Sequence, residues 1–233
     1  MINGKKVLGI TLARGGSKGI PKKNIYKINN KPLIAYTIEE CLKSKYIDKY
    51  IVSTDSKEIA EIAMSYGAEV PFLRPKVLAE DTSTSADAII HAINWLREIN
   101  EEFEITLEAM ATNPLKTVAH IDECLEMMED KQVPYVVAVN QIFDQHPSRV
   151  KFLEDSIMRD FYPEILESRR QDLTPNAFIR SGSIYCMNTD ILLKTKARYG
   201  KDNSAAYILQ AGDVINIDEV NDLLMAETIL KER

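Results

Sequence analysis

The stretch that most constrains this chain is residues 7–24, where an apolar run leads directly into a loop of small and basic residues. Residues 7–12 are rich in aliphatic side chains, and Gly15, Gly16 and Gly19 follow them, which predicts a buried strand and then a sharp turn. Glycines let backbone N–H groups approach a ligand closely. The sequence therefore predicts a ligand-binding loop directly after the first strand.

The charge around this loop is opposite in sign to that of the whole chain. Eight basic residues and no acidic one precede Glu39, whereas the net charge of the protein is −6. A local positive field within an acidic protein favours a small anionic ligand over nucleic acid or an anionic membrane. We expect a triphosphate; an ordinary glycine turn with solvated lysines is the alternative.

Two common phosphate-binding motifs do not fit this loop. The P-loop pattern fails because the loop lacks its four-residue spacing and its Lys-Ser/Thr ending. The dinucleotide fingerprint fails because the three glycines have the wrong spacing and Pro21 interrupts the expected start of a helix. The loop therefore belongs to another class of phosphate site.

Composition is ordinary for a globular protein. The 233 residues are 45% apolar and 27% charged, which is enough to build a core. Cys41, Cys124 and Cys186 are far apart in the sequence, which favours core positions in a reducing compartment over metal or redox roles. We find neither a signal sequence nor an 18-residue apolar stretch, and we expect a cytoplasmic protein.

Predicted strands and helices alternate along the chain, which is typical of an α/β fold with a parallel sheet covered by helices. We expect a single domain over residues 1–233. The predicted strands span residues 7–12, 50–54, 70–73, 105–111, 135–139, 183–187, 206–210 and 214–217, and the main helices 32–42, 56–66, 87–99, 118–128 and 219–230. Residues 143–177 break the alternation, and a loop of this length is usually functional or ordered by a partner.

The loop and several later motifs resemble one enzyme family. The loop reads A-R-G-G-S-K-G-I-P-K-K-N, and N-K-P-L-I-A-Y-T-I, V-S-T-D, L-R-P, D-T-S-T-S-A-D, R-R-Q-D and I-N-I-D follow in order up to residue 218. This arrangement is similar to that of the acylneuraminate cytidylyltransferases, or CMP-sialic acid synthetases. The resemblance implies a Rossmann-like nucleotidyltransferase fold that transfers CMP from CTP to a nonulosonic sugar acid and releases pyrophosphate. It also implies a homodimer, in which residues 143–177 form a dimerisation insertion that reaches the partner's sugar site.

The resemblance also implies roles for individual residues. Arg14, Lys23 and Arg170 are expected to be catalytic, because phosphoryl-type transfer needs cations that neutralise charge developing on phosphate oxygens. The expected nucleotide-binding residues are Ala13, Arg14, Gly15, Gly16, Ser17, Lys18, Lys23, Asn24, Arg74 and Ser85. The expected substrate-binding residues are Met110, Arg149, Arg170 and Gln171, with Arg169 and Arg180 as alternatives to Arg170.

The sequence departs from the family pattern at two positions. Asn216 and Asp218 stand where relatives carry two carboxylates for Mg²⁺, so a site for Mg²⁺, or alternatively Mn²⁺, would hold one carboxylate and one neutral amide oxygen. Met110 replaces a glutamine that hydrogen-bonds the acyl sugar in relatives, so the identity of the nonulosonic acid stays open. Synthesis of CMP-Kdo and a non-catalytic nucleotide-binding relative are the alternative functions, and neither nucleic acid nor a membrane is an expected partner.

Overall fold

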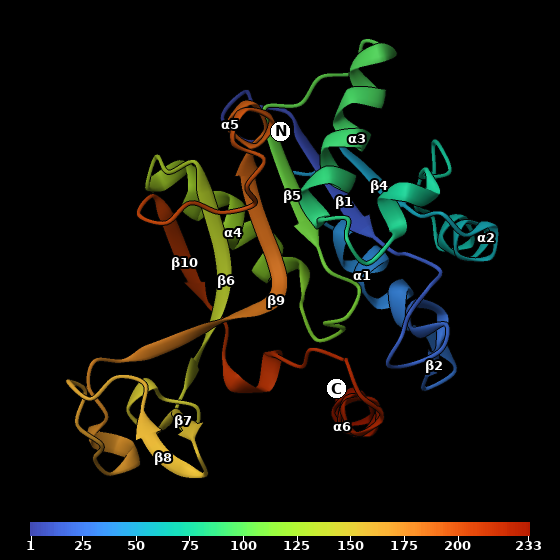
Figure 1. The fold of residues 1–233 in the computed structure, drawn as a ribbon. Helices are drawn as coiled ribbons and strands as arrows, with labels where there is room; N and C mark the ends of the chain where they lie inside the picture. Colours follow the sequence, from blue (N-terminus) through green and yellow to red (C-terminus); the bar gives the residue numbers. More distant parts are fainter.

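A six-stranded sheet forms the centre of the protein, whose residues 1–233 are described by a computed structural model (Figure 1). The strand order is β10-β6-β9-β5-β1-β4. β9 runs antiparallel to its neighbours β5 and β6, and the other neighbouring strands are parallel. The strands are β1 (Val7–Leu12), β4 (Lys49–Ser53), β5 (Ile105–Ala109), β6 (Tyr135–Ile142), β9 (Ala177–Asn188) and β10 (Ser204–Ile208). The α/β, mostly parallel architecture that the sequence predicts is confirmed.

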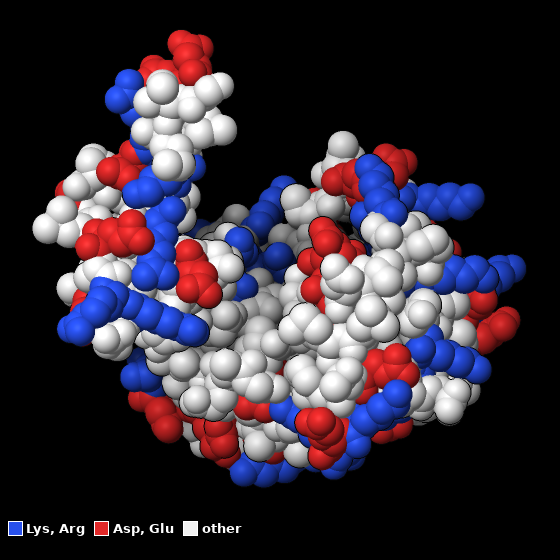
Figure 2. Space-filling model, turned by 90° about the horizontal axis from the view of Figure 1, so that it is seen from below, with Lys and Arg blue, Asp and Glu red and all other residues white.

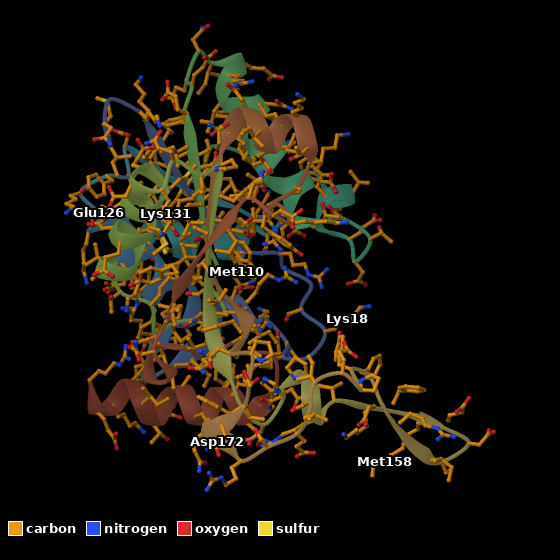
Figure 3. All side chains as sticks on the ribbon, turned by 90° about the vertical axis from the view of Figure 1, so that its left-hand side faces the viewer. Lys18, Met110, Glu126, Lys131, Met158 and Asp172 are labelled. Atoms are coloured by element: carbon orange, nitrogen blue, oxygen red, sulfur yellow. The ribbon has the colours of Figure 1, made fainter.

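Helices cover both faces of this sheet (Figures 1 and 3). One apolar cluster joins the sheet to α1 (Leu33–Leu42), α2 (Lys57–Ser65) and α4 (Val118–Asp130). A second cluster joins the other face to α3 (Ser85–Glu98) and α5 (Thr189–Thr195). Val7 belongs to the first cluster and Leu8 and Ile10 to the second, because successive side chains of a strand point to opposite faces.

The last helix brings the end of the chain beside its beginning. α6 (Val220–Glu232) packs through Leu223 and Ala226 into a third apolar cluster, which also contains Ile20 and Ile217. The short hairpin of β2 (Lys27–Ile28) and β3 (Lys31–Pro32) lies in the same region. Residues 216–218 are thereby held next to the glycine-rich loop.

The structure corrects the predicted elements at several places. Residues 70–73 form no strand. Isolated bridges pair Leu73 with Thr54 and the preceding Glu69 with Ile51 of β4, and residues 214–217 are irregular. β9 is longer than the predicted strand 183–187. The three cysteines are buried and unbonded, as expected.

Residues 143–177 leave the body of the protein as an arm between β6 and β9 (Figure 1). The arm contains a hairpin of β7 (Lys151–Glu154) and β8 (Ile157–Asp160). Figure 3 shows Met158 of this hairpin at the far end of the arm, well away from Met110 in the body. His146 fixes the base of the arm, because its imidazole lies 2.9 Å from Ser148 Oγ and 2.8 Å from the Pro175 carbonyl.

Candidate nucleotide-binding site

A cavity of about 470 Å³ lies beside the ends of β1 and β5, where the glycine-rich loop begins. Its lining comes from four segments, within residues 12–24, 74–88, 108–112 and 216–218. Figure 2 shows the molecule hollowed between the body and the arm, with basic side chains inside the hollow. Ligands of α/β sheets bind in this position, outside the carboxyl ends of the strands.

Lys23 and Asp218 both line this cavity and contact each other. Lys23 Nζ donates to Asp218 Oδ1 at 2.8 Å and to the Ile217 carbonyl at 2.7 Å. Asn216 Nδ2 donates to the other carboxylate oxygen of Asp218 at 2.6 Å. The two residues predicted to hold a metal are therefore in contact, and Lys23, the loop cation predicted to contact phosphate, binds one of them.

Arg14 and Lys18 share a carboxylate that the sequence analysis did not identify. Arg14 Nη1 lies 3.0 Å from Asp81 Oδ1, and Lys18 Nζ lies 2.6 Å from Asp81 Oδ2. These two cations lower the pKa of Asp81 below its usual value. Asp81 lies in the polar loop that leads into α3. Its acidic side chain in that loop is the sequence feature that could have indicated this contact.

The backbone of the loop differs from the prediction at one point. We predicted that Gly15 offers its N–H to a phosphate, but this N–H donates to Asp55 Oδ1 at 2.9 Å. Gly16 has open space around it. Gly19 packs closely against the backbone of Asp218, since a Cβ added to Gly19 would be 2.6 Å from the Asp218 carbonyl oxygen. The loop is thus anchored on both sides.

The remaining predicted nucleotide-binding residues lie in or next to the cavity. Ser17, Asn24 and Ser85 line it, and Asn24 Nδ2 holds the loop by donating to the Arg14 carbonyl at 3.1 Å. Ser85 opens α3, which Thr84 and Asp87 cap reciprocally. Ala13 is fully buried beneath the loop and does not line the cavity.

Arg74 gives the strongest indication of an anionic ligand. Its side chain lines the cavity although the residue is only 5% exposed, and its buried Nε has no hydrogen-bond partner. Burial lowers the pKa of Arg74, partly offset by the nearby Asp55 carboxylate. A buried guanidinium with an unsatisfied donor is costly unless a ligand completes its hydrogen bonds.

Two buried ionisable residues that the sequence analysis missed lie in the wall of the cavity and directly behind it. Glu108 of β5 is 1% exposed and pairs with Arg198, at 2.6 Å between Oε2 and Nη1. Lys116 lies behind Met110, and its Nζ donates to Thr37 Oγ1, the Met110 carbonyl and the Asn113 carbonyl at 2.5–2.7 Å. Burial lowers the pKa of Lys116 to about 7. Met110 itself lines the cavity.

The other predicted substrate-binding residues lie outside this cavity, in the arm. Arg149 pairs with Asp144 and Glu167, and the Arg170 guanidinium stacks on the Phe143 ring at 4.8 Å. Gln171 is exposed in the same 3₁₀ turn as Arg170. Within one chain, these residues do not line the cavity beside the glycine-rich loop.

The donor set at Asn216 and Asp218 is compatible with Mg²⁺. Both side chains line the cavity, and together they offer carboxylate and amide oxygens. Magnesium accepts one or two protein oxygens when phosphate oxygens and water supply the rest. No cluster of three metal-binding side chains exists elsewhere in the protein, and no helix is long and apolar enough to span a bilayer.

Solved structures share this fold. A CMP:2-keto-3-deoxy-manno-octonic acid synthetase complexed with CTP matches with a TM-score of 0.73 at 17% identity, covering 97% of this chain and 99% of that one. A cytidylyltransferase from Leptospira borgpetersenii matches with a TM-score of 0.63 at 14% identity, covering 98% of this chain and 88% of that one. The Rossmann-like nucleotidyltransferase fold is confirmed.

Curated proteins resemble the chain over nearly its whole length. A pseudaminic acid cytidylyltransferase of Campylobacter jejuni is 34% identical over 227 residues, which are 97% of each chain. A CMP-N,N'-diacetyllegionaminic acid synthase of Legionella pneumophila is 30% identical, again over 97% of each. An N-acylneuraminate cytidylyltransferase of Escherichia coli is 32% identical over 98% of this chain and 53% of its own length. The cytidylyltransferase family model matches residues 8–170, and the chain belongs to this family of nucleotidyltransferase enzymes.

Proposed function

We propose that this protein transfers CMP from CTP to a nonulosonic sugar acid and releases pyrophosphate. The observation that carries the proposal is the cavity beside the glycine-rich loop, where Arg74 is buried with an unsatisfied donor and Arg14 and Lys23 lie on the loop side. The family of the chain supplies the reaction type. The relatives named for pseudaminic, legionaminic and N-acylneuraminic acids supply the class of acceptor.

In this reaction a hydroxyl oxygen of the acid attacks the α-phosphorus of CTP and loses its proton to water. The bond from that phosphorus to the bridging oxygen breaks, and pyrophosphate leaves. Arg14 and Lys23 are placed to neutralise charge on the phosphate oxygens, and Lys18 lies nearby at the surface. Asp218 and Asn216 would hold Mg²⁺, which when bound adds positive charge beside the phosphates. Asp81 would compete with a bound nucleotide for Arg14 and Lys18.

We also propose that each protomer is a single domain and that the arm, residues 143–177, joins two protomers in a homodimer. The arm exposes large apolar side chains, including Leu153, Met158 and Leu166 at 71%, 69% and 82% exposure. An apolar surface of this kind marks an interaction site. In such a homodimer, Arg149, Arg170 and Gln171 of one protomer would complete the acceptor site of the other.

A pyrophosphate-release screen tests the reaction. CTP with pseudaminic, N,N'-diacetyllegionaminic or N-acylneuraminic acid should release pyrophosphate in the presence of Mg²⁺, and ATP, GTP and UTP should not. A faster reaction with the eight-carbon acid Kdo would favour the CMP-Kdo alternative. Binding of CTP by calorimetry without release of pyrophosphate from any acid would reject the proposal in favour of a non-catalytic nucleotide-binding protein.

The solution mass tests the homodimer. Light scattering coupled to gel filtration should give twice the mass of one chain, and Leu153→Glu with Met158→Glu should shift the protein to one chain. Met64→Glu on α2 is the matched control, because Met64 is 51% exposed but lies outside the arm. A wild-type mass of one chain would contradict the dimer without affecting the proposed reaction.

A further inference from the structure

A buried ion pair separates the nucleotide cavity from a second cavity. Glu108 lines the first cavity, and its partner Arg198 lines the second, which has a volume of about 790 Å³. The two cavities share Thr84 and Ser85. The two cavities therefore meet at the start of α3, on either side of the pair formed by Glu108 and Arg198.

Arg198 is held in a fixed orientation. Its guanidinium stacks on the ring of Tyr185 at 4.5 Å while Nη1 donates to Glu108 at 2.6 Å. Attraction by Glu108 raises the pKa of Arg198 although the side chain is largely buried. A guanidinium has five N–H donors in a fixed plane, and the carboxylate of Glu108 takes one of them. The other donors are available for a ligand.

A second arginine extends this arrangement toward the surface. Tyr199 lies 6.5 Å from Tyr185 between ring centroids, and Arg180 stacks on Tyr199 at 4.5 Å. Arg180 has no carboxylate within ion-pair distance, in contrast to Arg198. Two arginines and two tyrosines thus lead from the buried Glu108 outward, and this path is positively charged.

We infer that Arg198 binds the carboxylate of the acceptor sugar acid and that Glu108 is the residue that positions Arg198. The inference rests on the proposed function. A carboxylated acceptor needs a cation next to the nucleotide, and a planar guanidinium binds a carboxylate through two parallel hydrogen bonds. Within one chain, the arginines of the arm lie outside both cavities, whereas Arg198 lines the second.

Steady-state kinetics with pseudaminic acid and its methyl ester test this assignment. The wild type should prefer the acid, and Arg198→Met should raise the KM for the acid roughly 10- to 100-fold and abolish the preference over the ester. The calorimetric Kd for CTP should stay within about twofold, because the phosphate-binding cations are untouched. Glu108→Gln should raise the KM for the acid by less and keep the preference, because Arg198 remains but is held less firmly.

Two further variants keep the test independent of folding. Glu108→Gln combined with Arg198→Met removes both buried charges together and should lose the preference in the same way. Arg97→Met is the matched control, because Arg97 pairs with Asp190 on the surface and should leave every constant unchanged. An unchanged preference for the acid in Arg198→Met or in the double variant would overturn the inference but not the proposed function. A wild type that releases no pyrophosphate with any of the three acids would overturn the proposed function and the inference with it.

Discussion

Lys23 Nζ lies 2.8 Å from Asp218 Oδ1, although 195 positions separate the two residues in the sequence. Lys23 is largely buried, whereas the Asp218 side chain is 61% exposed and also accepts a hydrogen bond from Asn216. A cation at Asp218 therefore competes with Lys23 for one carboxylate. This competition leads to a prediction about metal dependence.

Asn216→Asp should lower the Mg²⁺ concentration needed for half-maximal pyrophosphate release by about tenfold, because it adds a second carboxylate beside Asp218. Asp218→Asn should raise it. A Mg²⁺ titration at saturating CTP measures both, with Asp190→Asn, which is 84% exposed and distant from the site, as the control. Equal half-maximal concentrations in all four proteins would contradict the assignment of these two residues to a metal.

Gly19→Ala should destabilise the folded protein, whereas Gly16→Ala should not. A Cβ at residue 19 would lie 2.6 Å from the Asp218 carbonyl oxygen, but a Cβ at residue 16 has nothing within 4 Å. We expect Gly19→Ala to cost roughly 1–3 kcal/mol of unfolding free energy and to weaken CTP binding. Urea unfolding and calorimetry compare the pair, and equal behaviour of the two variants would rule out close packing as the cause.

Asp81→Asn should tighten CTP binding. Asp81 pairs with both Arg14 and Lys18, so it competes with a nucleotide for these cations. Exposed ion pairs are weak, and we expect the Kd for CTP to fall by up to about fivefold. Glu80→Gln is the control, since Glu80 lines the same cavity and forms no ion pair. Should Glu80→Gln tighten binding as much, the effect would be one of general charge rather than of this contact.

Lys116 should make stability depend on pH above neutrality. Burial lowers its pKa to about 7 in the folded protein, whereas an unfolded lysine has a pKa of about 10.4. Between these values the unfolded chain binds the extra proton, so the free energy of unfolding rises with pH by at most about 1.4 kcal/mol per unit. Lys116→Met removes this contribution.

Urea unfolding at pH 7, 8 and 9 measures the effect. The stability of the wild type should rise relative to that of Lys116→Met as the pH increases, because the other titrating groups are common to both proteins. Lys131→Met, an exposed lysine beyond α4, should follow the wild type (Figure 3). A constant difference between wild type and Lys116→Met across this range would mean that Lys116 does not change its charge there.

Local features of the structure could be predicted from the sequence, and contacts between distant segments could not. β1 and the turn after it follow from residues that are adjacent in the chain, and Ser56 caps α2 as its position suggests. Residues 70–73 and 214–217 are short apolar runs that look like strands, but neither is paired along its length in the sheet. Periodicity alone does not distinguish such runs.

The residues of the site divide in the same way, into those found from local motifs and those found only from contacts between distant segments. Arg14, Lys23 and Arg74 are found by motif because the loop and the L-R-P segment are continuous in sequence. Asp81 and the pair of Glu108 with Arg198 are not, because their partners are 63 to 90 positions away and belong to different segments. Whether a charge is buried and paired depends on the complete fold.

The contact between Lys23 and Asp218 sets an order on how the site is assembled during synthesis. A ribosome makes the glycine-rich loop early, yet Lys23 meets its carboxylate, and Gly19 its packing neighbour, only after residue 218 has left the exit tunnel. A nascent chain that stops after β10 already has every strand of the central sheet. Its glycine-rich loop would be held by Asp55 but would still lack the contacts of residues 217 and 218, so the complete site forms only after residue 218 has been made.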